Sequence, residues 1–140
     1  MPVKDTFHSA VRNALEKSGW TITHDPFVIP VGKTKVYIDL GAEKEKTIAA
    51  EKGKEKIAVE IKSFSGLSQI LDFHSALGQY LFYLPGLEEK DPERELFLGL
   101  PSRLLEDFLE EPYIRKVIKR YSIKVLIYDP INEIIVEWIR

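Results

Sequence analysis

Residues 55–63, which read Glu-Lys-Ile-Ala-Val-Glu-Ile-Lys-Ser, constrain the fold more than any other segment of the sequence. Large apolar side chains alternate there with small or charged ones, and an alternation with period two predicts a strand. Glu60 and Lys62 then lie on one face of that strand. Because desolvating a charge costs on the order of several kcal/mol, this pair must be solvated, paired or bound to an ion. The segment is therefore either a half-exposed strand or part of a polar site.

The rest of the sequence alternates between helix-like and strand-like patterns. Apolar residues recur at helical spacing in residues 6–18, 67–84, 102–108 and 112–120. Strand patterns cover residues 20–24, 35–40, 55–63, 95–100, 123–128 and 133–139, with 47–52 as a continuation or a short strand. This order predicts an α/β fold with one mixed sheet flanked by helices and a C-terminal hairpin.

Two of these segments carry sharper expectations. Residues 67–84 are apolar enough to predict a helix that is buried on most sides, and Pro85-Gly86 should end it. Gly41 should end the strand at residues 35–40, whose residues Val36, Ile38 and Leu40 should share one face.

Length and composition set the class of protein. A chain of 140 residues has the length of one domain, so we predict a single domain over residues 1–140. The chain has no cysteine, which excludes a disulfide framework and thiolate metal sites. It also has no uncharged apolar run of about 18 residues, so we expect a cytoplasmic protein without a membrane span.

The charge is nearly balanced but segregated. A net charge of −2 argues against a protein that coats nucleic acid through bulk electrostatics. Residues 33–62 hold 8 basic and 6 acidic residues, residues 88–112 hold 3 and 9, and residues 113–140 hold 6 and 3. The pattern indicates either ordinary solvated surfaces or one face that tolerates phosphate while another repels it.

Asp39 gives the charged strand a chemical interpretation. It precedes Glu60 by 21 positions and lies near the end of the preceding strand, so the two carboxylates are expected to converge. Carboxylate oxygens suit Mg²⁺ or Mn²⁺, and Lys62 beside them would orient a water or stabilise charge on a scissile phosphate. Glu51 is a rival for the second carboxylate. For Asp39 alone, an ordinary strand-end aspartate is the alternative.

Three further residues are candidates for the same site. Gln79 and Tyr83 are spaced i, i+4 on the apolar helix, and both side chains can hydrogen-bond a phosphate. His8, in the first predicted helix, is a candidate metal ligand. The alternatives are helix surface, core contact and a partly exposed histidine. His24 and His74 have no partner at metal-ligand spacing and are interpreted as structural.

Taken in order, Asp39, Glu60-x-Lys62 and Gln79-x-x-x-Tyr83 resemble the PD-(D/E)xK nuclease superfamily, specifically its RecB-like branch. Ile38 stands where members of the superfamily have proline. The resemblance implies a restriction-endonuclease-like fold with an αβββαβ core. It also implies an active site that gathers these residues with a histidine of the first helix, here His8.

Nearly the whole chain is similar to the XisH-type fdxN element excision controlling factors of cyanobacteria. The stretches that carry this likeness include Gly19-Trp20-Thr21-Ile22-Thr23-His24-Asp25-Pro26, Tyr37-Ile38-Asp39-Leu40-Gly41-Ala42-Glu43 and Ile57-Ala58-Val59-Glu60-Ile61-Lys62-Ser63-Phe64. The resemblance implies a role in the excision of a DNA element during heterocyst differentiation. The implied partners are DNA, a site-specific recombinase and the small protein XisI.

Three hypotheses follow. The first is a Mg²⁺- or Mn²⁺-dependent DNA phosphodiesterase that uses Asp39, Glu60 and Lys62, with Gln79 and Tyr83 on the substrate side and His8 on the metal. The second is a non-catalytic regulator that controls a recombinase through protein contacts. The third is a toxin-like nuclease restrained by its small partner. The sequence leaves the oligomeric state open, a homo-oligomer included.

Overall fold

The computed structural model describes residues 6–140, except for the side chains of Thr47, Ile48 and Glu51. Six strands form the main sheet in the order β1-β4-β5-β6-β7-β8. Their bounds are β1 Thr21–His24, β4 Leu40–Ile48, β5 Glu51–Ile61, β6 Arg94–Pro101, β7 Val125–Asp129 and β8 Ile134–Ile139. The pairs β5/β6 and β6/β7 are parallel and the other pairs are antiparallel, so the sheet is mixed. A separate hairpin consists of β2 (Phe27–Val31) and β3 (Thr34–Ile38).

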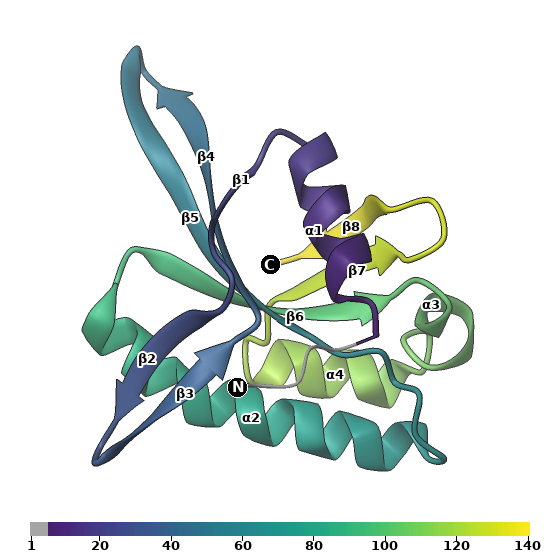
Figure 1. The fold of residues 1–140 in the computed structure, drawn as a ribbon. Helices are drawn as coiled ribbons and strands as arrows, with labels where there is room; N and C mark the ends of the chain where they lie inside the picture. The colour runs from purple at the N-terminus through teal and green to yellow at the C-terminus, as the bar shows by residue number, and fades with distance from the viewer. Residues whose placement is uncertain (1–5) are drawn as a thin grey trace.

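Helices cover both faces of the main sheet (Figure 1). The long helix α2 (Gln69–Lys90) and α4 (Pro112–Arg120) lie on one face, and α1 (His8–Lys17) lies on the other. The short α3 (Leu104–Asp107) follows β6. The predicted α/β architecture, with a mixed sheet flanked by helices and a terminal hairpin, is confirmed at this level.

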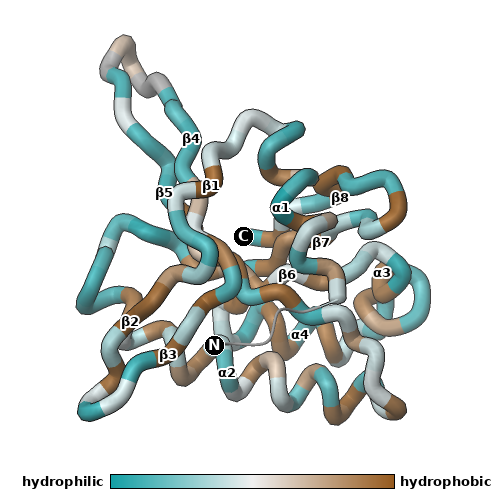
Figure 2. Tube along the Cα trace, in the orientation of Figure 1, coloured by the Kyte–Doolittle hydropathy of each residue, from teal (hydrophilic) through white to brown (hydrophobic). Residues whose placement is uncertain are grey.

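The buried side chains form two clusters, one on each face of the sheet. Val11 and Leu15 of α1 pack on one face with Ile57 and Val59 of β5. Ala58, the residue between those two, packs on the opposite face with residues of α2, α4 and the β2–β3 hairpin. The alternation predicted for residues 55–63 is therefore present, and it directs Glu60 to the face that α2 covers. Hydropathic colouring of the chain shows that β6, in the middle of the sheet, is mostly apolar (Figure 2).

The prediction of one continuous strand over residues 35–40 is wrong at Asp39. The chain bends at Asp39, so β3 ends at Ile38 and β4 begins at Leu40. Ile38 then packs on the α2 side and Leu40 on the α1 side, although the alternation placed them together. Gly41 does not end a strand but continues β4, which pairs with β5 from Leu40 to the hairpin tip. A single residue outside the strands, such as Asp39, reverses the face of the sheet to which the following side chains point. An alternating sequence pattern does not reveal such a break.

The prediction for the long helix is also wrong at its end and on its outer side. α2 passes through Pro85 and continues to Lys90. Proline removes one helical hydrogen bond, but Leu87 beyond it is buried in the core and this packing outweighs the loss. The helix buries one side only, whereas the sequence predicted burial on most sides.

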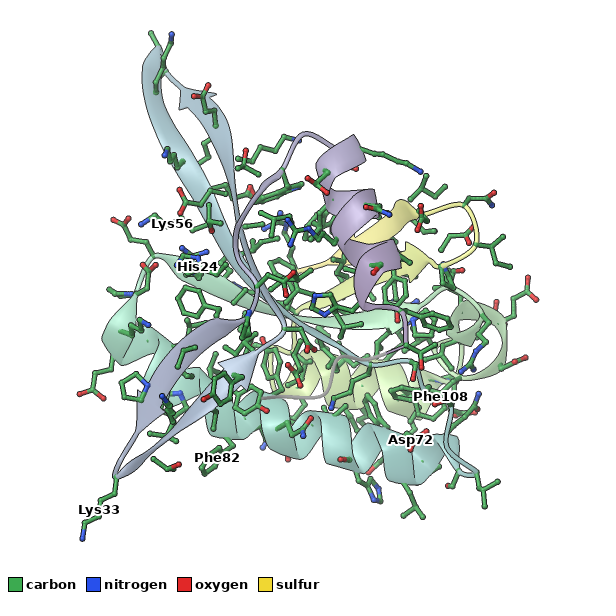
Figure 3. The ribbon with its side chains drawn as sticks, viewed as in Figure 1. His24, Lys33, Lys56, Asp72, Phe82 and Phe108 are labelled. Carbon is green, nitrogen blue, oxygen red and sulfur yellow. The ribbon has the colours of Figure 1, made fainter. Side chains whose placement is uncertain are left out.

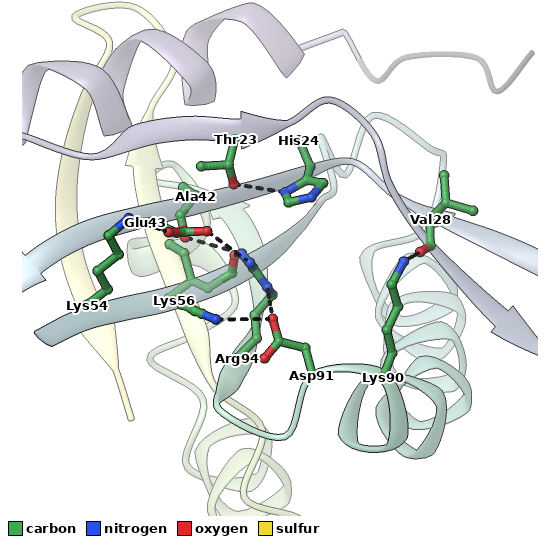
Figure 4. Close-up of polar contacts among 11 residues, drawn as sticks. Thr23, His24, Val28, Ala42, Glu43, Lys54, Lys56, Lys90, Asp91 and Arg94 are labelled. Atoms are coloured by element: carbon green, nitrogen blue, oxygen red, sulfur yellow. Dashed lines mark hydrogen bonds and ion pairs between the residues drawn. The ribbon is translucent and has the colours of Figure 1, made fainter.

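The β4–β5 hairpin projects from the body of the molecule, and a buried arginine secures its base (Figures 1 and 4). Arg94 of β6 donates to the carbonyl oxygens of Ala42 and Ile57, at 3.4 and 2.9 Å. The same guanidinium forms ion pairs with Glu43 at 3.4 Å and Asp91 at 3.0 Å. A buried charge with this many partners fixes the hairpin to the sheet.

Candidate active site

Asp39 and Glu60 meet at the bend between β3 and β4. The backbone N–H of Asp39 donates to Oε1 of Glu60 at 3.3 Å, and the N–H of Ile61 donates to Oδ2 of Asp39 at 2.8 Å. These two bonds hold the carboxyl groups of adjacent strands beside one another. The structure thus brings together the two acids that the sequence analysis singled out.

Burial makes both carboxyl groups difficult to ionise. Glu60 is only 6% exposed, and burial followed by the charge of Asp39 raises its pKa to about 8. Burial likewise raises the pKa of Asp39, against the lowering effects of the Ile61 N–H, His8 and Lys62. Two acids that share a desolvated site bind a proton or a cation more readily than a single exposed acid does.

Lys62 lies on the same face of the strand as Glu60. Its Nζ is 3.5 Å from Oε2 of Glu60. The backbone of Lys62 is held on both sides, because its N–H donates to the Gly99 carbonyl and its carbonyl accepts from the Tyr128 hydroxyl, each at 2.9 Å. The ammonium group is therefore anchored within reach of the carboxylate pair.

Helix α2 closes the site with its inner face. Tyr83 is buried, and burial followed by the charges of Glu60 and Asp39 raises the pKa of its hydroxyl to about 12. Gln79, one turn earlier, has its Oε1 buried without a hydrogen-bond partner among the described residues. Tyr83 therefore lies near the acids, and Gln79 lies one helical turn away with a polar group available to a ligand.

His8 lies near Asp39, but its ring is committed to a different carboxylate. Its Nε2 is 2.8 Å from Oδ1 of Asp25, and Arg12 is 2.5 Å from Oδ2 of the same aspartate. Nδ1 of His8 is buried without a hydrogen-bond partner among the described residues. Histidines that bind metals commonly donate their other N–H to a carboxylate, so this arrangement suits a ligand. Sequence reasoning missed Asp25, which it interpreted only as a strand interruption.

The remaining candidates lie elsewhere. Glu51 begins β5 at the hairpin tip, where it pairs with Ile48, and its side chain lies outside the described part. His24 lies beside Arg94 at an exposed position, and partial desolvation followed by the charges of Arg94 and Lys90 lowers its pKa. His74 is exposed on the outer side of α2.

A small polar hollow adjoins Lys62. It measures about 160 Å³ and its lining includes Ser63, Phe64, Ser65 and Ser75. Arg103, which the sequence analysis did not consider, donates to the carbonyl oxygens of Ser63 and Phe64 at 2.7 and 2.5 Å. Phe64 has a positive φ of 54°. A non-glycine residue in that conformation needs such external support, so Arg103 fixes the loop beside the site.

The donor set fits a hard divalent cation but not a closed protein cage. Among residues 6–140, no three His, Asp or Glu side chains gather closely enough to hold a metal by themselves. Mg²⁺ is commonly bound by one or two carboxylates together with waters and substrate phosphates. Asp39 and Glu60 supply that number of carboxylates, whereas His8 does not complete a set of three with them in this structure.

Fold and site together define a mixed α/β protein with a buried carboxylate pair and an ammonium group at the end of a strand. The chain belongs to the XisH family, because the model of that family, described as XisH protein, matches residues 1–136. No curated protein matches the chain. Among residues 6–140, every helix is too short or too polar to cross a bilayer.

Two solved structures are similar over almost the whole chain. A crystal structure of an XisH family protein from Nostoc punctiforme has 41% sequence identity and a TM-score of 0.86, covering 97% of this chain and all of the other. A crystal structure of a fdxN element excision controlling factor protein from Anabaena variabilis has 37% identity and a TM-score of 0.85, covering 98% of this chain and all of the other.

Proposed function

We propose that this protein acts on DNA in the cytoplasm as an element excision controlling factor with a restriction-endonuclease-like fold, and that it hydrolyses phosphodiester bonds. The name of the Anabaena variabilis relative supports the first part. One observation carries the second: the carboxyl groups of Asp39 and Glu60 meet in a buried site with Lys62 3.5 Å from Glu60.

Each side chain has a defined part in this proposal. Asp39 and Glu60 would hold Mg²⁺ or Mn²⁺ through their oxygens, and His8 would have to move toward them for its Nδ1 to serve as a further ligand. The bound cation would polarise the scissile phosphate and lower the pKa of a water molecule. Lys62 would move from Glu60 to the phosphate or to the attacking water, where an ammonium group stabilises developing negative charge.

Helix α2 would position the DNA strand. The amide oxygen of Gln79 has no partner among the described residues and can accept a hydrogen bond from a water molecule, while its NH2 group can donate to a phosphate oxygen. The hydroxyl of Tyr83 stays protonated at physiological pH, because burial and the nearby acids raise its pKa, so it serves as a donor.

The test is cleavage of supercoiled and branched DNA with Mg²⁺ or Mn²⁺, compared with the same reaction in EDTA. We expect cleavage by the wild type and a loss of at least about 100-fold in Glu60→Gln and Lys62→Ala. Glu93→Gln and Lys116→Ala, at exposed positions, are matched controls and should cleave normally. Cleavage that survives both site substitutions, or none with either metal, would contradict the proposal.

A second candidate is a regulator that controls a recombinase through protein contacts, with XisI as a further partner. The acidic stretch at residues 88–112 favours it, because 9 acids against 3 basic residues disfavour contact with DNA. Under this alternative, the protein binds the recombinase at low salt but not DNA, and Glu60→Gln leaves that binding unchanged. Steeply salt-dependent binding to DNA would favour the nuclease.

A further inference from the structure

The outer side of helix α2 is uncharged and largely apolar, although it faces solvent. Leu71 is 65% exposed, Leu81 46% and Phe82 61%. Between Asp72 and Glu88 the sequence has no Asp, Glu, Lys or Arg, in a chain of which 30% is charged. Figure 3 shows Phe82 pointing away from the sheet. A helix that faces solvent normally carries charged residues on its outer side. An exposed apolar face of this kind is therefore typical of an interaction surface.

The exposed residues follow the spacing of a helix–helix seam. Leu71, His74, Gly78, Leu81 and Pro85 are separated by three and four residues in alternation, and all five are exposed. This is the a/d pattern through which two helices pack along one stripe. The pattern predicts that the partner of this surface is another helix.

We propose that the partner is a second copy of this chain, whose α2 packs antiparallel across a two-fold axis near Ala76. In this register Leu71 of each copy faces Leu81 of the other, and the bulky His74 faces Gly78. The space around Gly78 is open, since a Cβ built there would meet nothing within 4 Å. Each contact is reciprocal, so that a residue and its partner position meet twice across the axis, as an isologous interface requires.

A knob and a hollow at the two ends of the seam fit the same register. Leu67, just before α2, is wholly exposed. It would face Pro85 of the second copy, which lines a hollow of about 520 Å³ together with Val31 and Phe82. Leu67 is therefore placed to enter that hollow, and the contact is repeated by symmetry.

Charge and size are also compatible with this arrangement. Over residues 67–85 the only charged side chain is Asp72, which accepts a hydrogen bond from the Gly66 N–H, and the register brings no second acid opposite it. The 22 residues of α2 make a face about 33 Å long. A specific interface buries ~800 Å² per partner, so the neighbouring β2–β3 hairpin would have to contribute to the contact as well.

The proposed dimer does not obstruct the candidate active site. Tyr83 is among the buried residues of α2 and faces the acids, while the seam lies on the opposite side of the helix. The inference is therefore independent of the proposed nuclease activity, and either can fail alone.

The test is the mass in solution, measured by light scattering and sedimentation at about 100 µM protein. We expect the wild type at twice the 16.1 kDa of one chain, and Leu71→Glu and Leu81→Glu at 16.1 kDa. Ile131→Glu is the matched control, because Ile131 is 89% exposed in the β7–β8 turn, and it should stay dimeric. A monomeric wild type, or dimers that persist in both seam variants, would overturn the proposal.

Disulfide trapping tests the register without destabilising the interface by charge. The chain has no cysteine, so Leu71→Cys and Leu81→Cys are single-cysteine variants. A mixture of the two should form a disulfide-linked heterodimer on mild oxidation, whereas each alone should not cross-link. Efficient cross-linking of each variant to itself would indicate a parallel pair and overturn the antiparallel arrangement.

Discussion

The backbone N–H of Asp39 donates to the Glu60 side chain, which lies 21 residues further along the chain and on a different strand. The bond joins the bend that precedes β4 to Glu60, the second-to-last residue of β5. It keeps the two carboxyl groups together in a buried site, where burial raises both pKa values and the charge of Asp39 raises that of Glu60 further. Four predictions depend on this pair or on the groups that support it.

The first prediction concerns stability against pH in EDTA. Burial and the charge of Asp39 raise the pKa of Glu60 from its ordinary 4.5 to about 8 in the fold, so the folded state binds the proton more tightly. This contribution to stability is complete below about pH 4.5 and is lost as the pH rises to about 8. We expect the free energy of unfolding to fall over that range by on the order of a few kcal/mol, since one pKa unit equals about 1.4 kcal/mol.

Urea unfolding at several pH values measures this dependence. Glu60→Gln cannot ionise, so its stability should fall much less between pH 5 and pH 8. Glu93→Gln, at an exposed position, should follow the wild type. If the free energy of unfolding of Glu60→Gln fell with pH in parallel with that of the wild type, ionisation of Glu60 would not be the cause of the fall.

The second prediction concerns metal binding without reference to cleavage. A cation that binds only the folded state stabilises it by about 2.7 kcal/mol at 100 times the dissociation constant. For a chain of 140 residues this raises Tm by about 5–10 °C. The Mg²⁺-induced shift should be larger at pH 8 than at pH 6, because protons compete for the two carboxylates. Differential scanning fluorimetry of wild type and Asp39→Asn checks it, and equal shifts in the two would exclude Asp39 as a ligand.

The third prediction concerns Tyr128, which supports Lys62 from behind. Tyr128→Phe keeps the ring but removes the hydroxyl that donates to the Lys62 carbonyl at 2.9 Å. Loss of this buried bond should cost about 1 kcal/mol of stability. If the protein cleaves DNA, the rate should also fall, because Lys62 is less well placed. Tyr113→Phe, at an exposed position, should change neither quantity.

The fourth prediction concerns Arg103 and the loop it secures. Arg103→Met removes the donor to the Ser63 and Phe64 carbonyls, and the left-handed Phe64 loses its support. We expect a loss of about 1–3 kcal/mol and faster amide exchange around residues 63–66. Lys116→Met serves as the control. Unchanged exchange in Arg103→Met would mean that the packing of Phe64 alone holds the loop.

Local sequence patterns were sufficient to predict those strands in which burial and periodicity agree. The strand at residues 55–63 and the doubly covered strand at 95–100 both follow from their side chains, because each pattern has one low-energy arrangement. The continuation of α2 through Pro85 did not follow, since the preference of proline against helix is overcome by packing that lies far away in sequence. The β2 strand was missed because Asp25-Pro26 was interpreted only as a break.

The sequence by itself determined the α/β class, the facing of Glu60 and Lys62, and the helix that carries Gln79 and Tyr83. Only the tertiary structure decided that the chain turns at Asp39 so that its carboxyl group meets Glu60, and that Asp25 engages His8. The physical reason is that facing and helical spacing depend on neighbouring residues, whereas the meeting of two charges depends on strand register and layer packing. Those are set by contacts between residues far apart in the chain.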